Sequence, residues 1–304
     1  MTGERRQPER IPGAAPAPSA GLGVLFAAVA SSSFGLVITL AGVAYAGGAN
    51  AGAVIELRFL VAVPVMAALL RATRGAFLPP SGVRKGVVLV ALGNFCVTIG
   101  YLTSILFIPV SLGTVVFYTY PLMVAAIAPL LEHKRLGRLQ QAAFGLAFAG
   151  LVLTLGPSLN GLDWRGVGLA SFAALAATYV FIASPRVVAA YNAVGMSLYV
   201  NLIGSGLMLV AVLALGDFVL PQSPHGWAGL GGLCLFYIVA SLSMFLALRA
   251  AGSVRTSLVF NLEPLVAIAA AAVLLGERLS PLQMGGVALV IGALSLAGLA
   301  RAKA

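Results

Sequence analysis

VFYTYPLMVAAIAPLLEHKRL, residues 116–136, returns 143 positions later as VFNLEPLVAIAAAAVLLGERL, residues 259–279. The two stretches align without a gap, and nine of their 21 positions are identical. The identities include Pro121 with Pro264 and Arg135 with Arg278. A repeat that separates two halves of a very apolar chain is typical of membrane proteins built from two related halves, whose binding sites lie between the halves.

The composition is that of an integral membrane protein. The chain has 304 residues, of which 61% are hydrophobic and 9% charged, whereas about 25% are charged in a soluble domain. The net charge of +10 comes from basic residues in short loops between apolar spans, so membrane anchoring explains it better than nucleic acid does. The expected partners are therefore membrane lipids and a small molecule. Cys96 and Cys234 lie inside apolar spans and indicate neither a disulfide nor a metal site.

Ten stretches are long and apolar enough to cross a bilayer, which takes about 20 residues. An even number of spans places both termini on one side, and that side carries fifteen Lys and Arg residues against two, Arg165 and Arg278, on the other. The positive-inside rule then predicts cytoplasmic termini in the cytoplasmic (inner) membrane, with residues 1–18 a disordered tail. The predicted spans are 19–44, 52–70, 84–107, 111–131, 138–156, 166–184, 195–215, 226–248, 254–275 and 282–300.

The repeat must be inverted. Residues 19–156 form a first half and residues 166–300 a second half, each with five spans. Because five is odd, equivalent spans cross the membrane in opposite directions. We therefore predict an all-α integral membrane protein of ten transmembrane helices, arranged as two inverted five-helix repeats about a pseudo-two-fold axis in the membrane plane.

Three segments resemble the EamA-type family of the drug/metabolite transporter superfamily, in its amino-acid and metabolite exporter branch. They are ELRFLVAVPVMAALL (56–70), FYTYPLMVAAIAPLLEHKRLG (117–137) and ALRAAGSVRTSLVFNLEPLVAIAAAAVLLGERLSPLQMGGVALVIGAL (247–294). The resemblance implies a central cavity lined by the first, third, fourth, sixth, eighth and ninth helices. Where relatives usually carry a Trp in the first and sixth helices, this chain has Phe34 and Ala176.

Two charges lie inside predicted spans. Glu263 is near the middle of the ninth span, where a carboxylate is costly and should face partner groups or water rather than lipid. We expect it to contact a substrate amine or to carry a coupling proton; the alternative is a packing role beside hydroxyls or Arg. Arg58 lies about a third of the way into the second span. The family resemblance implies a place at the edge of the fold, so we expect a structural charge, with a carboxylate clasp in the cavity as the alternative.

Pro121 and Pro264 occupy equivalent midpoints and are predicted to be hinges of a gate. Each removes one helical hydrogen bond and leaves the carbonyl of Phe117 or Phe260 free; static kinks are the alternative. Six further residues are predicted to line the cavity. Two flank the first proline, three lie on helices that the resemblance expects to line the cavity, and one is a polar residue within the ninth span: Tyr118, Tyr120, Asn94, Tyr101, Tyr237 and Asn261.

Together with these patterns, the family resemblance implies a secondary transporter that exports small amphipathic metabolites, above all amino acids, by alternating access. The alternative is an integral-membrane enzyme, or a lipid or drug translocase, that uses the same cavity. The spans contain no His and only Glu56 and Glu263 as acids, which makes poor catalytic machinery. We therefore expect no enzyme activity, no catalytic residue, no metal and no cofactor, with a coupling proton left open. Sequence leaves open the substrate, the coupling ion, the direction and the oligomeric state.

Overall fold

The computed structural model describes residues 20–131, 162–216, 218–260 and 262–302, together with isolated positions between 138 and 153. Every regular element among the described residues is helical, as predicted. Apart from one short 3₁₀ turn, η1 (Ser81–Val83), the elements are α1 (Ala20–Ala46), α2 (Ala51–Ala72), α3 (Arg84–Ser104), α4 (Val110–Phe117), α5 (Tyr120–Leu131), α7 (Trp164–Ala190), α8 (Ala193–Leu215), α9 (Pro224–Val259), α10 (Leu262–Leu274) and α11 (Pro281–Ala302).

The described helices follow the predicted spans closely. Six of them are long and apolar enough to cross a membrane, and shorter apolar helices follow in the fourth, ninth and tenth spans. The predicted fifth span, residues 138–156, lies largely outside the described residues, so the count of ten stays a prediction.

Two predicted spans are broken where a continuous helix was expected. The fourth consists of α4 and α5, which are separated at Tyr118 and Thr119. In the second half, α9 runs past the end of the eighth span, changes direction at Gly252 (φ 74°, ψ 172°) and ends at Val259, after which α10 begins at Leu262. The backbone of Gly252 is in a region that residues with a Cβ rarely adopt, so glycine permits this change of direction.

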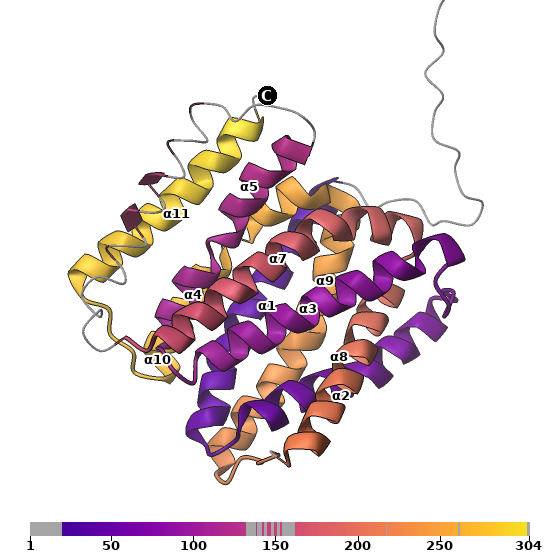
Figure 1. Ribbon diagram of the computed structural model, residues 1–304, viewed down its shortest axis with the longest axis horizontal. Coiled ribbons are helices and arrows are strands. Elements are labelled where there is room, and N and C mark those ends of the chain that lie inside the picture. Colours follow the sequence, from indigo (N-terminus) through magenta and orange to yellow (C-terminus); the bar gives the residue numbers. More distant parts are fainter. Residues whose placement is uncertain are drawn as a thin grey trace, which may run out of the picture.

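The helix packing follows the inverted repeat (Figure 1). α1 packs against α9 in the same way that α3 packs against α7, and α2 packs against its own equivalent, α8. Figure 1 shows α1, α3, α7 and α9 in the middle, α2 and α8 on one flank, and α5 and α11 on the other. Both flanking helices α2 and α8 begin at an asparagine cap: Asn50 Oδ1 accepts from Ala53 N at 2.9 Å, and Asn192 Oδ1 from Gly195 N at 2.5 Å.

Hydrogen bonds to backbone carbonyls join the loops at each end of the molecule. At one end, Gln222 N donates to Gly47 O at 2.8 Å and Asn50 N to Val219 O at 3.1 Å. At the other, the Tyr191 hydroxyl lies within hydrogen-bond distance of the carbonyls of Ala76 (2.8 Å) and Phe77 (2.7 Å). Loops that the charge pattern assigns to the same side of the membrane are therefore the loops that meet.

A carboxylate of the second half caps the N-terminus of α4 in the first half. Glu277, just after α10, accepts hydrogen bonds from Val110 N at 2.8 Å, Ser111 N at 3.1 Å and Ser111 Oγ at 2.6 Å. These are the N–H groups that a helix N-terminus leaves without partners, and the helix dipole favours a negative charge there. Leu275 packs nearby against Gly42 of α1. The two halves are therefore fastened to each other at the α4 end of the molecule.

Single cysteines test the orientation that the charge asymmetry predicts. Gln222 and Leu78 are exposed and lie in the loops at opposite ends. After replacement of Cys96 and Cys234, Gln222→Cys should react with a membrane-impermeant maleimide on intact cells, and Leu78→Cys only after permeabilisation. The reverse pattern would place the termini on the outside.

Candidate functional site

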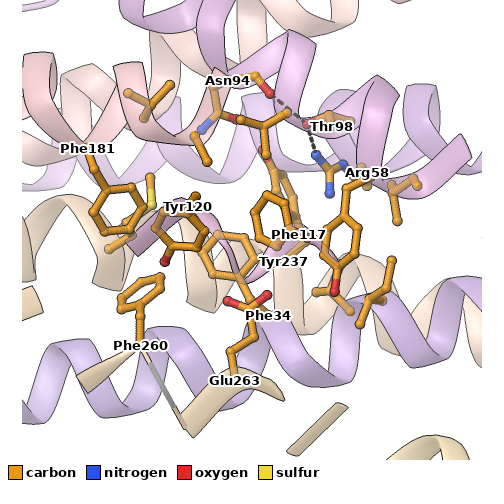
Figure 2. A pocket seen from close by; sticks show the side chains of 18 residues that line it. Phe34, Arg58, Asn94, Thr98, Phe117, Tyr120, Phe181, Tyr237, Phe260 and Glu263 are labelled. Atoms are coloured by element: carbon orange, nitrogen blue, oxygen red, sulfur yellow. Dashed lines mark hydrogen bonds between the residues drawn. The ribbon is translucent and has the colours of Figure 1, made fainter. Parts of the chain in front are cut away.

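A cavity lies between the two halves and is walled mainly by aromatic rings (Figure 2). It encloses about 630 Å³ of empty space, counting the part that opens to the outside, and 18 side chains line it. The lining includes the aromatic residues Phe34, Tyr101, Phe117, Tyr120, Phe181, Tyr237 and Phe260.

All six helices that the family resemblance implies contribute to the wall. The lining residues come from α1, α3, the α4–α5 pair, α7, α9, the break at Phe260 and the start of α10, and α2 adds Arg58. Phe34 keeps an aromatic ring at the first of the two positions where relatives carry Trp. At the second position the neighbour Ala177, not Ala176, lines the cavity. Phe181, one turn further along α7, supplies a ring that the sequence analysis missed, because a phenylalanine in an apolar span carries no mark of the face it occupies.

Tyr120 and Glu263 lie at equivalent places, as their alignment predicts. Tyr120 is the first residue of α5 and Glu263 the second of α10, and both side chains reach the cavity. Pro121 and Pro264 follow them directly. There the missing proline N–H removes no helical bond, because the first turn of a helix has no acceptors for its N–H groups. The prolines therefore begin new half-helices and do not bend continuous ones; whether they form a gate stays a prediction.

Tyr118 does not line the cavity, contrary to expectation. It caps the end of α4, and its hydroxyl donates to the Phe260 carbonyl at 2.7 Å, across the boundary between the halves. The Glu263 N–H donates to the same carbonyl at 3.0 Å. The carbonyl that we predicted to be free is thus satisfied from inside the protein. Both donors come from the protein, as a backbone carbonyl at a helix break requires where lipid offers no hydrogen-bond donor.

Close packing behind the broken helices positions Tyr120 and Glu263. Gly35 of α1 lies so near α10 that a Cβ there would be 2.7 Å from the Glu263 carbonyl oxygen. In the first half, the equivalent contact is made by Thr178 of α7, whose Oγ1 lies 3.5 Å from the Tyr120 carbonyl oxygen. Each half-helix start is therefore held by the helix that opens the other half.

Arg58 lines the cavity, so the expectation that it lies at the edge of the fold is wrong. Its guanidinium donates to Thr98 Oγ1 and lies 4.0 Å from the centre of the Tyr237 ring. The side chain is 4% exposed. Glu56, two residues earlier, faces away and accepts a hydrogen bond from Ser205 Oγ of α8 at 2.7 Å. A helical step of two residues turns the side chain by about 200°, which separates the two charges.

The other predicted cavity residues divide into two groups. Asn94, Tyr101, Tyr120 and Tyr237 all line the cavity, whereas Asn261 lies outside the described residues. The Tyr101 hydroxyl is 2.8 Å from Thr114 Oγ1. In contrast, the hydroxyls of Tyr120 and Tyr237 are buried and have no hydrogen-bond partner among the described residues. Buried hydroxyls usually have partners, so these two are available to a ligand.

Two inverted halves, helices broken at equivalent points and a cavity between them define a membrane transporter of the drug/metabolite type. The model of the EamA-like transporter family matches residues 21–156 and again residues 164–299. The chain belongs to this family. A solved structure described as "Crystal structure of protein" aligns with a TM-score of 0.68 and 18% identity, over 94% of this chain and 99% of that one, and bears out the fold. No curated protein matches the chain.

Gly35→Ala tests whether the close packing of α1 against the start of α10 positions Glu263. The added methyl group would lie 2.7 Å from the Glu263 carbonyl oxygen, and overpacking of this kind costs about 1–3 kcal/mol. We expect normal insertion, a lower unfolding temperature and a several-fold loss of transport. Gly206→Ala is the control, since nothing lies within 4 Å of its Cβ position. Equal effects of the two substitutions would contradict the interpretation.

Pro264→Ala tests the break between α9 and α10. Alanine removes the ring that clashes with the preceding turn, so α9 and α10 can join into one helix. In that helix the restored N–H would bond the Phe260 carbonyl in place of the Tyr118 hydroxyl. We expect normal insertion and slower transport. The matched control is Pro281→Ala, at the exposed first position of α11. Wild-type transport by Pro264→Ala and Pro121→Ala together would make both prolines static features.

Proposed function

We propose that the protein exports small amphipathic metabolites, above all amino acids, across the cytoplasmic membrane by alternating access. One observation carries the proposal: the carboxyl group of Glu263 and the buried, unpartnered hydroxyls of Tyr120 and Tyr237 face one aromatic cavity between the repeats. An acid buried at this depth is rarely placed there for packing alone. It supports a site for a substrate that carries both a polar and an apolar part.

In this proposal Glu263 holds the substrate amine. Glu263 is 4% exposed and makes no ion pair with an Arg or Lys in the described part of the chain. The Tyr118 hydroxyl lies beside the carboxyl group, but it carries no charge. An ammonium group that entered the cavity would supply the missing counter-ion through a charge-assisted hydrogen bond. The rings around it, Phe260 and Phe34 among them, would take the apolar part of the substrate and exclude water.

Alternating access would then work through the two broken helices. Glu277 fastens α4 of the first half to the loop after α10 of the second. Opening of the cavity at that end requires these hydrogen bonds to break, because they join the two halves. We propose that they break and re-form in each transport cycle, while the packing of α1 on α9 and of α3 on α7 persists.

Flux into proteoliposomes tests the proposal. Purified protein should exchange internal for external labelled amino acids, and a panel of neutral, acidic and basic amino acids should identify the preferred one. A hydrophobic amine drug and a sugar phosphate complete the panel. Exchange of the drug alone would favour a drug translocase, and exchange of the sugar phosphate alone would overturn the assignment of an amine-bearing substrate.

Glu263→Gln separates an amine contact from a coupling site. The amide keeps the shape but loses the charge, and hydrogen bonds to charged groups contribute about 1.5–3 kcal/mol, which corresponds to a loss of roughly tenfold or more in binding. We expect that loss in calorimetric binding of the best amino acid. If Glu263 instead carries a coupling proton, binding and exchange should persist and only uphill transport driven by a proton gradient should fail. Glu56→Gln is the matched control, a buried acid outside the cavity.

A further inference from the structure

We propose that Arg58 is the carboxylate-binding residue of the cavity, so that the cargo is a zwitterion held with its carboxylate at α2 and its amine at Glu263 on α10. The inference rests on the proposed function and makes it more specific. It assigns a ligand contact to a residue that the sequence suggested was structural. It also implies one orientation of the ligand in the cavity, since Arg58 and Glu263 reach the cavity from different walls (Figure 2).

Arg58 is a buried cation without a counter-ion. Its side chain is 4% exposed, its Nε has no hydrogen-bond partner, and it pairs with no acid in the described part of the chain. A guanidinium that is always charged is expensive to remove from water unless an anion compensates it. The acid nearest to it in sequence, Glu56, is turned toward Ser205 of α8. An anion that enters the cavity is therefore the partner that Arg58 lacks.

The side chain is also held ready for an anion. The hydroxyl of Thr98 accepts from the guanidinium and itself donates to the Asn94 carbonyl at 3.0 Å, so the hydroxyl proton is already committed. The Tyr237 ring lies against the guanidinium at 4.0 Å and the Phe59 ring at 4.8 Å. These contacts orient the planar group, and a planar group with several donors suits a carboxylate, which can accept two parallel bonds.

The cavity fits one carboxylate and not a larger anion. Among its lining residues, Arg58 is the one cation and Glu263 the one acid. A phosphate or nucleotide carries at least two negative charges and needs clustered Lys or Arg, while Glu263 would repel the excess charge. A zwitterion compensates both charged groups at once. A plain amine would leave Arg58 without a partner, and a plain carboxylate would leave Glu263 without one.

Paired ligands separate this role from a structural one. L-leucine and L-leucinamide share the amine and the side chain, but the amide lacks the carboxylate charge. Calorimetry in detergent should show that the wild type binds L-leucine about tenfold to a hundredfold more tightly than L-leucinamide, the range expected for hydrogen bonds to a charged group. In R58M this preference should disappear, with L-leucine binding as weakly as the amide and the amide nearly unchanged.

Two further variants support the interpretation of R58M. Thr98→Val keeps the guanidinium and removes its hydrogen-bond partner, so the preference should fall by about twofold to tenfold, as expected for one neutral hydrogen bond. This variant also tests the proposal if R58M does not fold. E56Q changes a buried charge on the same helix outside the cavity and should leave the preference as in the wild type.

Three results would overturn the assignment. Equal weakening of both ligands in R58M would give Arg58 a purely structural role. Equal binding of L-leucine and L-leucinamide by the wild type would show that the cavity does not recognise the carboxylate. Binding of neither ligand, together with flux of no amino acid in the panel, would overturn the proposed function itself and this inference with it.

Discussion

The protein must satisfy every backbone polar group from within, because the hydrocarbon core of a membrane offers no hydrogen-bond partners. This constraint is most severe where the fourth and ninth spans break. At one break the Phe260 carbonyl receives the Tyr118 hydroxyl from the other half of the chain, at 2.7 Å. A bond that repairs the backbone of one half therefore also joins the two halves. The cavity lies beside the helix breaks. Broken helices can line a cavity there because their free backbone groups face the protein interior and not lipid.

The charges of the cavity follow from the same scarcity of partners. Arg58 and Glu263 are each too costly to bury without interactions, and they do not pair with each other. Thr98 and the Tyr237 ring support the guanidinium but do not neutralise it. This leaves two opposite charges on different walls of one cavity, an arrangement that a zwitterionic ligand would complete.

The two repeats are equivalent in architecture but not in chemistry. Asn50 and Asn192 cap equivalent helices, and Tyr120 and Glu263 begin equivalent half-helices. A tyrosine thus faces an acid across the pseudo-symmetry axis. The inverted fold provides two matching walls, and aromatic rings of both halves line the cavity, but the residues at equivalent places differ in chemistry.

The sequence by itself determined the membrane location, the inverted repeat and the boundaries of most described helices, and it singled out Glu263, which lines the cavity. Composition and charge distribution act through the bilayer, a solvent whose thickness and polarity are the same for every protein, so they can be read without coordinates. Only the tertiary structure decided which side of a helix faces the cavity. Arg58 proved to line it and Tyr118 did not. In a span that is apolar on all sides, the periodicity of the sequence does not indicate which side of the helix faces the cavity. The packing of neighbouring helices and the breaks before Pro121 and Pro264 determine that side instead.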